Sequence, residues 1–348
     1  MITTTAAGRT WHYSHALGRE TGEHNGNVGG FMFPQDVVWT PGDVLFVLSR
    51  GFGHGIDGYE GDLGKRIGKT TIDEVHLGDF ARDGFTWPVS LDVSKDGRVF
   101  VSDEFENKIV VLPSARLTNY PEKDPDGGRV EWGEAGSADG QFNGPAGVAL
   151  EADDTLLVVD RGNGRVQRYT RDGEFLGGWG REGSGQGEFR QPWGVAVDAK
   201  GDVYVADWGN DRVQKFSSDG TYLMSFGGDP DSGAELDHPA NIAVDSDGDV
   251  YVTDWGNRRV QIYEPDGEII TALHGDANEL SKAGHHILNR DPESRLAFDA
   301  VEHAMSQTVR FERPVGIDIS PDDRVLITDI RGRVLVYDKD RAYEPPTA

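Results

Sequence analysis

The chain has 348 residues, with 60 Asp and Glu against 34 Lys and Arg, a formal net charge of −26 and no cysteine. The lack of cysteine excludes disulfides and thiolate chemistry, and the acidic balance argues against nucleic-acid binding, which depends on Lys and Arg neutralising phosphates. Residues 1–13 lack a basic segment followed by an apolar one, and no run has membrane-spanning length, so we expect a cytoplasmic protein that does not bind membranes.

Residues 9–33, at the start of the chain, resemble the fourth strand and exit loop of a unit that recurs six times in the rest of the sequence. The unit is clearest at 192–226, where apolar residues alternate with small or polar ones, the period of half-buried strands. Turn residues, among them Asp-Trp-Gly-Asn at 207–210, lead into a third strand at 212–216 and a fourth at 222–226. Four antiparallel strands per unit predict one blade of a β-propeller. The six units open at Pro34, Pro88, Pro145, Pro192, Pro239 and Pro314.

The unit that opens at Pro314 stops after three strands, and a candidate for its missing fourth strand lies at the other end of the chain. We predict that Thr10–Leu17 pairs with Val334–Tyr337, which closes the ring and removes the exposed edge of an open sheet. The predicted fold class is therefore all-β: one six-bladed β-propeller domain over residues 1–348.

The strand topology predicts which side chains gather at one end of the axial channel. The first strand of each blade is innermost and begins at the proline, and the turn after the second strand returns to the same face. Residues directly after each proline should line the mouth of the channel, and residues directly after each turn aspartate should form its rim, where a ligand is expected. The mouth residues are Gln35, Asp36, Val89, Ser90, Ala146, Gly147, Trp193, Gly194, Ala240, Asn241, Val315 and Gly316; the rim residues are Arg50, Glu104, Arg161, Trp208, Trp255 and Ile330.

Cations, carboxylates and indoles converge in this predicted site. Arg50 and Arg161 can hold a carboxylate or phosphate with paired donors, and tryptophans supply an apolar wall. Asp36, Glu104 and His54 are the candidate general acids or bases. The expected substrate-binding residues are Trp193, Trp208, Trp255, Asn241, Ser90, His285 and His286. The aspartates of the repeated turns should instead accept backbone N–H groups in their own turns.

Two segments depart from the repeat. Residues 49–58, SRGFGHGIDG, are rich in glycine, which suits close backbone approach or a flap, or else a decorated surface turn. The connection at 274–313 is the second, and we expect a helix at 291–310 with Asp291 at its cap. This helix would emerge on the mouth face between blades five and six, as a lid. The preceding pair, His285 and His286, would serve either in metal ligation or acid–base chemistry, or in packing of the lid.

The repeated unit, with PWGVAVD at 192–198 and VYVADWGNDRVQKF at 203–216, resembles the NHL repeat, which forms β-propellers. Around Ser49-Arg50-Gly51 and at 159–167 the chain is also similar to the peptidyl-hydroxyglycine amidating lyase family, and this resemblance implies that Arg50 and Arg161 face the substrate. In that family histidines directly after the blade-opening proline of three blades hold zinc. Here those positions are Gln35, Val89, Ala146, Trp193, Ala240 and Val315, so the zinc site is not expected.

Two functions remain open. The first is an enzyme of lyase or hydrolase type that acts on a small anionic or polar substrate in the axial pocket. A divalent cation in such an enzyme would use oxygen ligands such as Asp36, Glu104 and Asn241. The second is a propeller without catalysis, which binds a small molecule or a partner protein through its aromatic rim and acidic surface.

Overall fold

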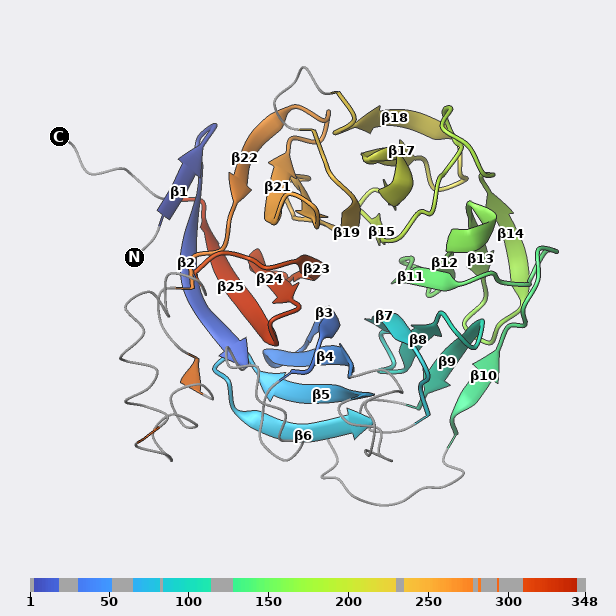
Figure 1. Cartoon of the computed structure of the whole chain (residues 1–348), viewed down its shortest axis with the longest axis horizontal. Helices are drawn as coiled ribbons and strands as arrows, with labels where there is room; N and C mark the ends of the chain where they lie inside the picture. The colour runs from blue at the N-terminus through green and yellow to red at the C-terminus, as the bar shows by residue number, and fades with distance from the viewer. Residues whose placement is uncertain are drawn as a thin grey trace.

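The structure is a computed structural model that describes residues 3–18, 31–51, 65–81, 84–113, 128–229, 235–277, 281–282, 293 and 309–342. Over these residues six antiparallel sheets follow one another around a central axis (Figure 1). The six-bladed β-propeller predicted from the repeat is confirmed. In the part of the chain described, no helix is long and apolar enough to span a bilayer.

The first three blades contain four strands each. Blade 1 comprises β3 (Pro34–Thr40), β4 (Val44–Arg50), β5 (Lys65–Thr71) and β6 (His76–Ala81). Blade 2 comprises β7 (Pro88–Val93), β8 (Val99–Asp103), β9 (Lys108–Leu112) and β10 (Val130–Trp132). Blade 3 comprises β11 (Pro145–Leu150), β12 (Leu156–Asp160), the 3-10 turn η1 (Arg161–Asn163), β13 (Arg165–Tyr169) and β14 (Phe175–Trp179).

The next two blades repeat this plan, and the last differs. Blade 4 comprises β15 (Val195–Val197), β16 (Val203–Asp207), the 3-10 turn η2 (Trp208–Asn210), β17 (Arg212–Phe216) and β18 (Tyr222–Phe226). Blade 5 comprises β19 (Pro239–Val244), β20 (Val250–Asp254), β21 (Arg259–Tyr263) and β22 (Ile269–Leu273). Blade 6 comprises β23 (Pro314–Ile319), β24 (Arg324–Asp329), β25 (Arg333–Asp340), β2 (Arg9–Gly18) and β1 (Thr3–Ala6).

Blade 6 joins the two ends of the chain. Strand β2 pairs with β25, with Leu17 opposite Val334 and Tyr13 opposite Tyr337, so the predicted closure is confirmed. Strand β1 adds a fifth, outermost strand that the repeat did not predict. Closure leaves the inner strands of all six blades facing one axis.

The hydrophobic core lies between neighbouring blades. The second strand of each standard blade is buried along its whole length, as in β12 and β16, because both of its faces pack against adjacent sheets. One core cluster, for example, joins Tyr251 and Val260 of blade 5 to Ile317 and Ile327 of blade 6. Apolar burial on both faces holds each blade at a set angle to the next and thereby positions the loops at the mouth.

The repeated turn aspartates explain why the repeat motif is long. Asp160 accepts hydrogen bonds from the Asn163 side chain at 2.8 Å and from Arg165 Nε at 2.8 Å. Its main backbone donor is Asn143 N at 2.7 Å, in the segment that enters the blade. The backbone donor expected from within the turn is thus replaced by one from the entry segment, and each aspartate ties the blade's entry to its second and third strands. The same arrangement surrounds Asp207 and Asp254.

The helix expected at 291–310 and the glycine-rich turn at 52–58 lie almost entirely outside the described residues. The described ends of the 274–313 connection lie side by side, since Phe311 N donates to His274 O at 3.0 Å and Ala277 N donates to Val309 O at 3.2 Å. Phe311 is buried in the core between blades 5 and 6. The lid therefore stays a prediction.

Candidate functional site

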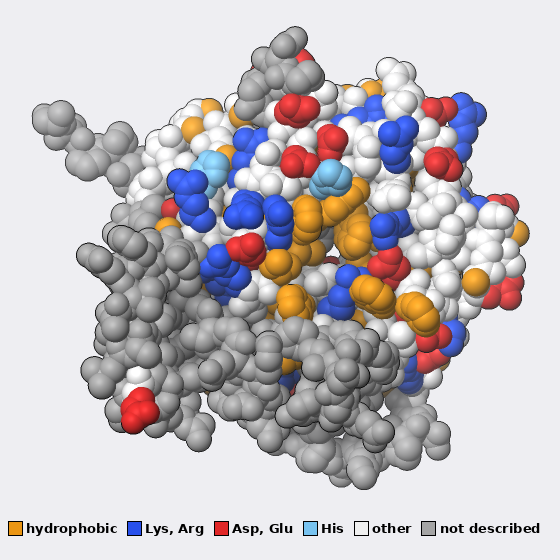
Figure 2. Space-filling view, viewed as in Figure 1, with side chains coloured by type: hydrophobic (Ala, Val, Ile, Leu, Met, Phe, Trp, Pro, Cys, Tyr) orange, Lys and Arg blue, Asp and Glu red, His pale blue; other side chains and the backbone are white. Residues whose placement is uncertain are grey.

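The predicted mouth residues gather around the propeller axis. On the face seen in Figure 2, hydrophobic side chains and Lys and Arg side chains surround a central hollow. This concentration of cations contrasts with the net charge of −26 for the whole chain. Guanidiniums at the hollow can attract small anions, although the carboxylates of Glu104, Asp211 and Asp237 also lie at this mouth.

At one side of the hollow, Glu104 lies between two arginines. Glu104 Oε2 accepts a hydrogen bond from Arg50 Nη2 at 3.0 Å, and Glu104 Oε1 accepts one from Arg161 Nη1. The guanidinium of Arg50 stacks on Trp87 at 4.6 Å from the ring centroid. Burial lowers the pKa of Arg50 to about 10, so it remains a cation at neutral pH. Glu104 therefore holds both guanidiniums in place.

Arg50 has an unused hydrogen-bond donor. Its Nε is buried and has no hydrogen-bond partner within the described part of the chain. A buried N–H without a partner costs free energy, on the order of 1–3 kcal/mol. Carboxylates and phosphates match the fork of a guanidinium.

Three indoles form a curved wall next to Arg161, which we call the tryptophan wall: Trp193, Trp208 and Trp255. The ring centroids are 5.3 Å apart for Trp193 and Trp208 and 5.2 Å apart for Trp208 and Trp255, with interplanar angles of 34° and 51°. Guanidiniums cap both ends, with Arg161 4.8 Å from the Trp193 ring and Arg313 4.2 Å from the Trp255 ring. Trp193, predicted for the mouth, and Trp208 and Trp255, predicted for the rim, thus form one row of contacting rings.

An imidazole lies beside the wall. The His238 ring is edge-on to Trp208 at 4.9 Å, and its Nδ1 is 2.5 Å from Asp237 Oδ1. A carboxylate at Nδ1 orients the ring and leaves Nε2 for a proton transfer. The ring is half-exposed, so a substrate can reach it.

Sequence reasoning missed His238 together with Trp87 and Arg313. Each of these residues directly precedes the proline that opens its blade. The prediction considered only residues after the prolines and after the turn aspartates. The residue before the proline belongs to the same mouth loop, so the repeat alignment could have indicated all three.

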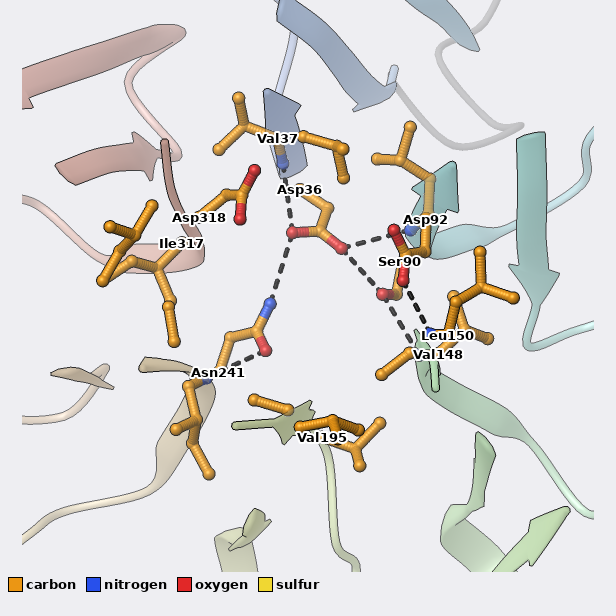
Figure 3. A pocket seen from close by; sticks show the side chains of 18 of the residues that line it. Asp36, Val37, Ser90, Asp92, Val148, Leu150, Val195, Asn241, Ile317 and Asp318 are labelled. Atoms are coloured by element: carbon orange, nitrogen blue, oxygen red, sulfur yellow. Dashed lines mark hydrogen bonds between the residues drawn. The ribbon is translucent and has the colours of Figure 1, made fainter. Parts of the chain in front are cut away.

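Below the mouth, the inner strands enclose an axial cavity of about 280 Å³ (Figure 3). Asp36 Oδ2 accepts hydrogen bonds from Ser90 Oγ at 2.7 Å and Leu91 N at 3.1 Å, and Asp36 Oδ1 accepts one from Asn241 Nδ2 at 3.2 Å. The three predicted residues Asp36, Ser90 and Asn241 are thus brought together from blades 1, 2 and 5. Burial raises the pKa of Asp36 to about 7, although its hydrogen bonds favour the anion.

Two further carboxyls line the cavity, and sequence reasoning did not single them out. Burial raises the pKa of Asp92 to about 6 and that of Asp318 to about 7. Asp92 accepts a hydrogen bond from Leu150 N at 2.7 Å, and Asp318 accepts one from Trp39 N at 2.6 Å. Each bond joins one blade to the next around the ring. Both residues lie two positions after a mouth residue, where the strand period of two again directs the side chain towards the axis.

The oxygen ligands expected for a divalent cation do not converge. Glu104 is bound to two arginines at the rim, whereas Asp36 and Asn241 bind each other deeper in the channel. Among the described residues, two other groups have metal-ligand spacing. One is Asp211, Asp237 and His238 at the mouth; the other is Asp245, Asp247 and Asp249.

The second group already binds a cation from the protein. Lys339 Nζ lies 2.5 Å from Asp245, 2.9 Å from Asp247 and 2.9 Å from Asp249. The ammonium occupies the position that a metal ion would take. The group at the mouth, with one imidazole and two carboxylates, has a donor set that suits a divalent transition metal.

The remaining predicted site residues, His54, His285 and His286, lie outside the described residues. The described site therefore contains the arginines, Glu104, the tryptophan wall and the Asp36 cluster from the prediction. It adds Trp87, Arg313, the Asp237–His238 pair and two axial carboxyls.

Comparison with solved structures shows propellers of the same fold. The streptogramin B lyase structure has a TM-score of 0.57 at 12% identity, with 97% of this chain and 100% of that chain covered. Virginiamycin B lyase from Staphylococcus aureus has a TM-score of 0.55 at 12% identity, covering 94% and 99%. An auxiliary nutrient binding protein from Bacteroides thetaiotaomicron has a TM-score of 0.62 at 12% identity, covering 95% and 77%. Identities this low establish the fold alone.

No curated protein sequence matches the chain significantly. The NHL repeat model matches residues 142–169, 189–216 and 236–263, which carry the turn aspartates of blades 3, 4 and 5. The three matches are the units in which the sequence pattern is strongest. The chain therefore contains NHL repeats and folds as a six-bladed β-propeller.

Proposed function

We propose that the protein is an enzyme of lyase or hydrolase type that acts on a small anionic substrate at the mouth of the propeller. The observation that carries this proposal is the pairing of an anion-binding group with a candidate base on one concave surface. Arg50 and Arg161 are held by Glu104, and the Asp237–His238 pair lies on the far side of Trp193 and Trp208.

Each group has a defined role in this proposal. The two arginines bind the substrate's carboxylate or phosphate. In a lyase, His238 Nε2 accepts a proton from a carbon in the part of the substrate that lies along Trp208, and the electrons of the C–H bond form a double bond as the leaving group departs from the next carbon. In a hydrolase, His238 Nε2 accepts a proton from water, which attacks the substrate. Asp237 orients the imidazole.

Asp36 is the second candidate acid. A carboxyl with a pKa of about 7 can donate or accept a proton at neutral pH. It already accepts hydrogen bonds from Val37, Ser90, Leu91 and Asn241, however. These bonds suit a role in holding the inner strands together, so His238 is the preferred base.

A second function, ligand binding without catalysis, is favoured by one observation. Glu104, the carboxylate nearest the two arginines, forms ion pairs with both of them, so it orients these cations rather than acting as an acid or base. If His238 does not transfer protons, the described mouth binds anions through Arg50 and Arg161 and carries out no chemistry. A test must therefore separate binding from turnover.

Binding is measured by isothermal titration calorimetry with inorganic phosphate, benzoate and D-galacturonate as probes. We expect at least one anion to bind, and we expect Arg161→Ala to weaken that binding about tenfold or more. Arg181→Ala is the control, because it removes the same charge from a guanidinium that is 79% exposed and pairs with Glu188. Equal affinities for wild type and Arg161→Ala, with an unchanged melting temperature, would refute the anion site.

Turnover is measured by proton NMR of uronates and their methyl esters incubated with the enzyme. A lyase produces a new alkene signal and a hydrolase releases methanol from the ester. We expect His238→Asn to abolish the product and leave the calorimetric affinity within about threefold. Binding without any product from wild type would favour the non-catalytic function.

A further inference from the structure

The mouth is longer than a small anion requires. From Arg161 the row continues through Trp193, Trp208 and Trp255 to Arg313, and each group is between 4 and 6 Å from the next. A single carboxylate with one ring would occupy one end of this row. A ligand that uses the whole row has several rings and is anionic at its ends.

The surroundings of the wall indicate what kind of ring fits. The carboxylates of Asp211 and Asp237 lie within reach of His238, whose ring contacts Trp208. Gly256, next to Trp255, donates its N–H to Asp237 O at 2.7 Å, which keeps this segment against the wall. Two carboxylates therefore lie beside the imidazole that contacts Trp208.

Sugar rings match this combination. A pyranose presents an apolar C–H face that stacks on an indole and a rim of hydroxyls that donate to carboxylates. A flat aromatic ligand would stack equally well but would desolvate the carboxylates of Asp211 and Asp237 without donating to them, at a cost in free energy. The curvature of the wall, with angles of 34° and 51° between its rings, suits consecutive sugar rings better than one rigid plane.

The guanidiniums favour an acidic sugar over a neutral one. A uronate carboxylate would accept hydrogen bonds from the guanidiniums of Arg50 and Arg161, which Glu104 holds next to each other. Arg161 and Arg313 stand at opposite ends of the wall. On a chain of net charge −26, cations gathered at one mouth overcome the repulsion that a polyanion would otherwise meet.

We propose that the mouth binds an acidic oligosaccharide of two or three rings, with one uronate carboxylate on Arg50 and Arg161 and its rings along the tryptophan wall towards Arg313. This inference rests on the proposed function, since it names the substrate class of the same site. It predicts affinity that increases with chain length and falls with salt.

The test is calorimetry with the full chain and three probes: trigalacturonate, galacturonate and a neutral galactose trisaccharide. We expect trigalacturonate to bind at least about tenfold more tightly than either of the others. Trp208→Ala should reduce the affinity for trigalacturonate to that for galacturonate, whereas Trp208→Phe, which keeps a stacking ring, should retain most of it. Arg161→Ala should abolish the preference for the acidic trisaccharide over the neutral one, and Arg181→Ala should preserve it.

The outcomes separate this inference from the proposed function. If galacturonate or benzoate binds as tightly as trigalacturonate and depends on Arg161, the anion site stands and the oligosaccharide is wrong. If the neutral trisaccharide binds equally well, the acidic requirement is wrong. If no anion binds, or if Arg161→Ala changes nothing, both proposals fail.

Discussion

Lys339 makes a buried ionic contact that joins the last blade to the fifth. Its Nζ lies 2.5–2.9 Å from Asp245, Asp247 and Asp249, in the turn between β19 and β20. The side chain of Lys339 is 1% exposed, and those of Asp245 and Asp249 are fully buried. Lys339→Met keeps the apolar stem and removes the charge.

The expected loss is large because three carboxylates would remain without this cation. Breaking a buried ion pair by removal of one partner costs about 3–5 kcal/mol. Arg9, at 2.6 Å from Asp249, would compensate in part, so we expect the lower half of this range. The loss is measured as the free energy of unfolding in urea at pH 7.5.

The pH dependence gives a second readout. Burial raises the pKa of Asp245, and the hydrogen bond from Lys339 opposes this effect. In Lys339→Met that opposition is gone, so the folded-state pKa of Asp245 rises further above its unfolded value. The folded variant then takes up a proton as the pH falls, and its deficit relative to wild type should shrink at pH 5.

Lys215 provides a matched control in blade 4. Its Nζ lies 2.9 Å from Asp202 and 3.7 Å from Asp198, and its side chain is 10% exposed. Lys215→Met removes an ammonium held within one blade by a single close carboxylate, so we expect a loss of about 1 kcal/mol. Equal losses for the two variants, or a Lys339→Met deficit that does not shrink at pH 5, would refute the reasoning.

Three further predictions follow from the channel and the mouth. Burial raises the pKa of Asp318 to about 7, so the folded state binds the Asp318 proton more tightly than the unfolded state does. The free energy of unfolding should therefore fall as the pH rises from about 4 to 7, by at most about 4 kcal/mol. Asp318→Asn should flatten this part of the urea-unfolding profile, and an unaltered profile would contradict the assignment. Gly316→Ala should destabilise by about 1–3 kcal/mol, because the new Cβ would lie 2.5 Å from Asp36 Cα; a melting temperature equal to that of wild type would contradict the close packing. If the mouth group holds a divalent metal, plasma mass spectrometry should find stoichiometric metal that chelation or Asp237→Asn removes, whereas metal retained by Asp237→Asn would place it elsewhere.

The hydrogen-bonded group of Asp36, Ser90 and Asn241 shows how much of the site can be predicted by counting positions in the repeat. Counting from the prolines placed Asp36, Ser90 and Asn241 at the same level of the channel, and the structure joins them by hydrogen bonds. The same count, continued by two residues, would have found Asp92 and Asp318. Their raised pKa values could not have been predicted, because they depend on burial by neighbouring blades.

The rim residues show what counting positions in the repeat cannot predict. The sequence indicated Arg50, Glu104 and Arg161 as three separate functional groups, with Glu104 as a free acid or base. The structure brings them into one ion-paired unit, so that Glu104 orients the cations. Repeat positions give the height of a residue along the axis but not the direction of its side chain.

The sequence by itself determined the strands of the repeated unit, the six blades and the closure, and it indicated part of the mouth. These features follow from a period of two, from turn residues and from repetition, all of which are local along the chain. Only the tertiary structure decided which charges pair, that His238 adjoins Trp208, and that Lys339 occupies the acidic turn of blade 5. These contacts cross between blades, and their partners are chosen by the packing of neighbouring sheets once the ring has closed.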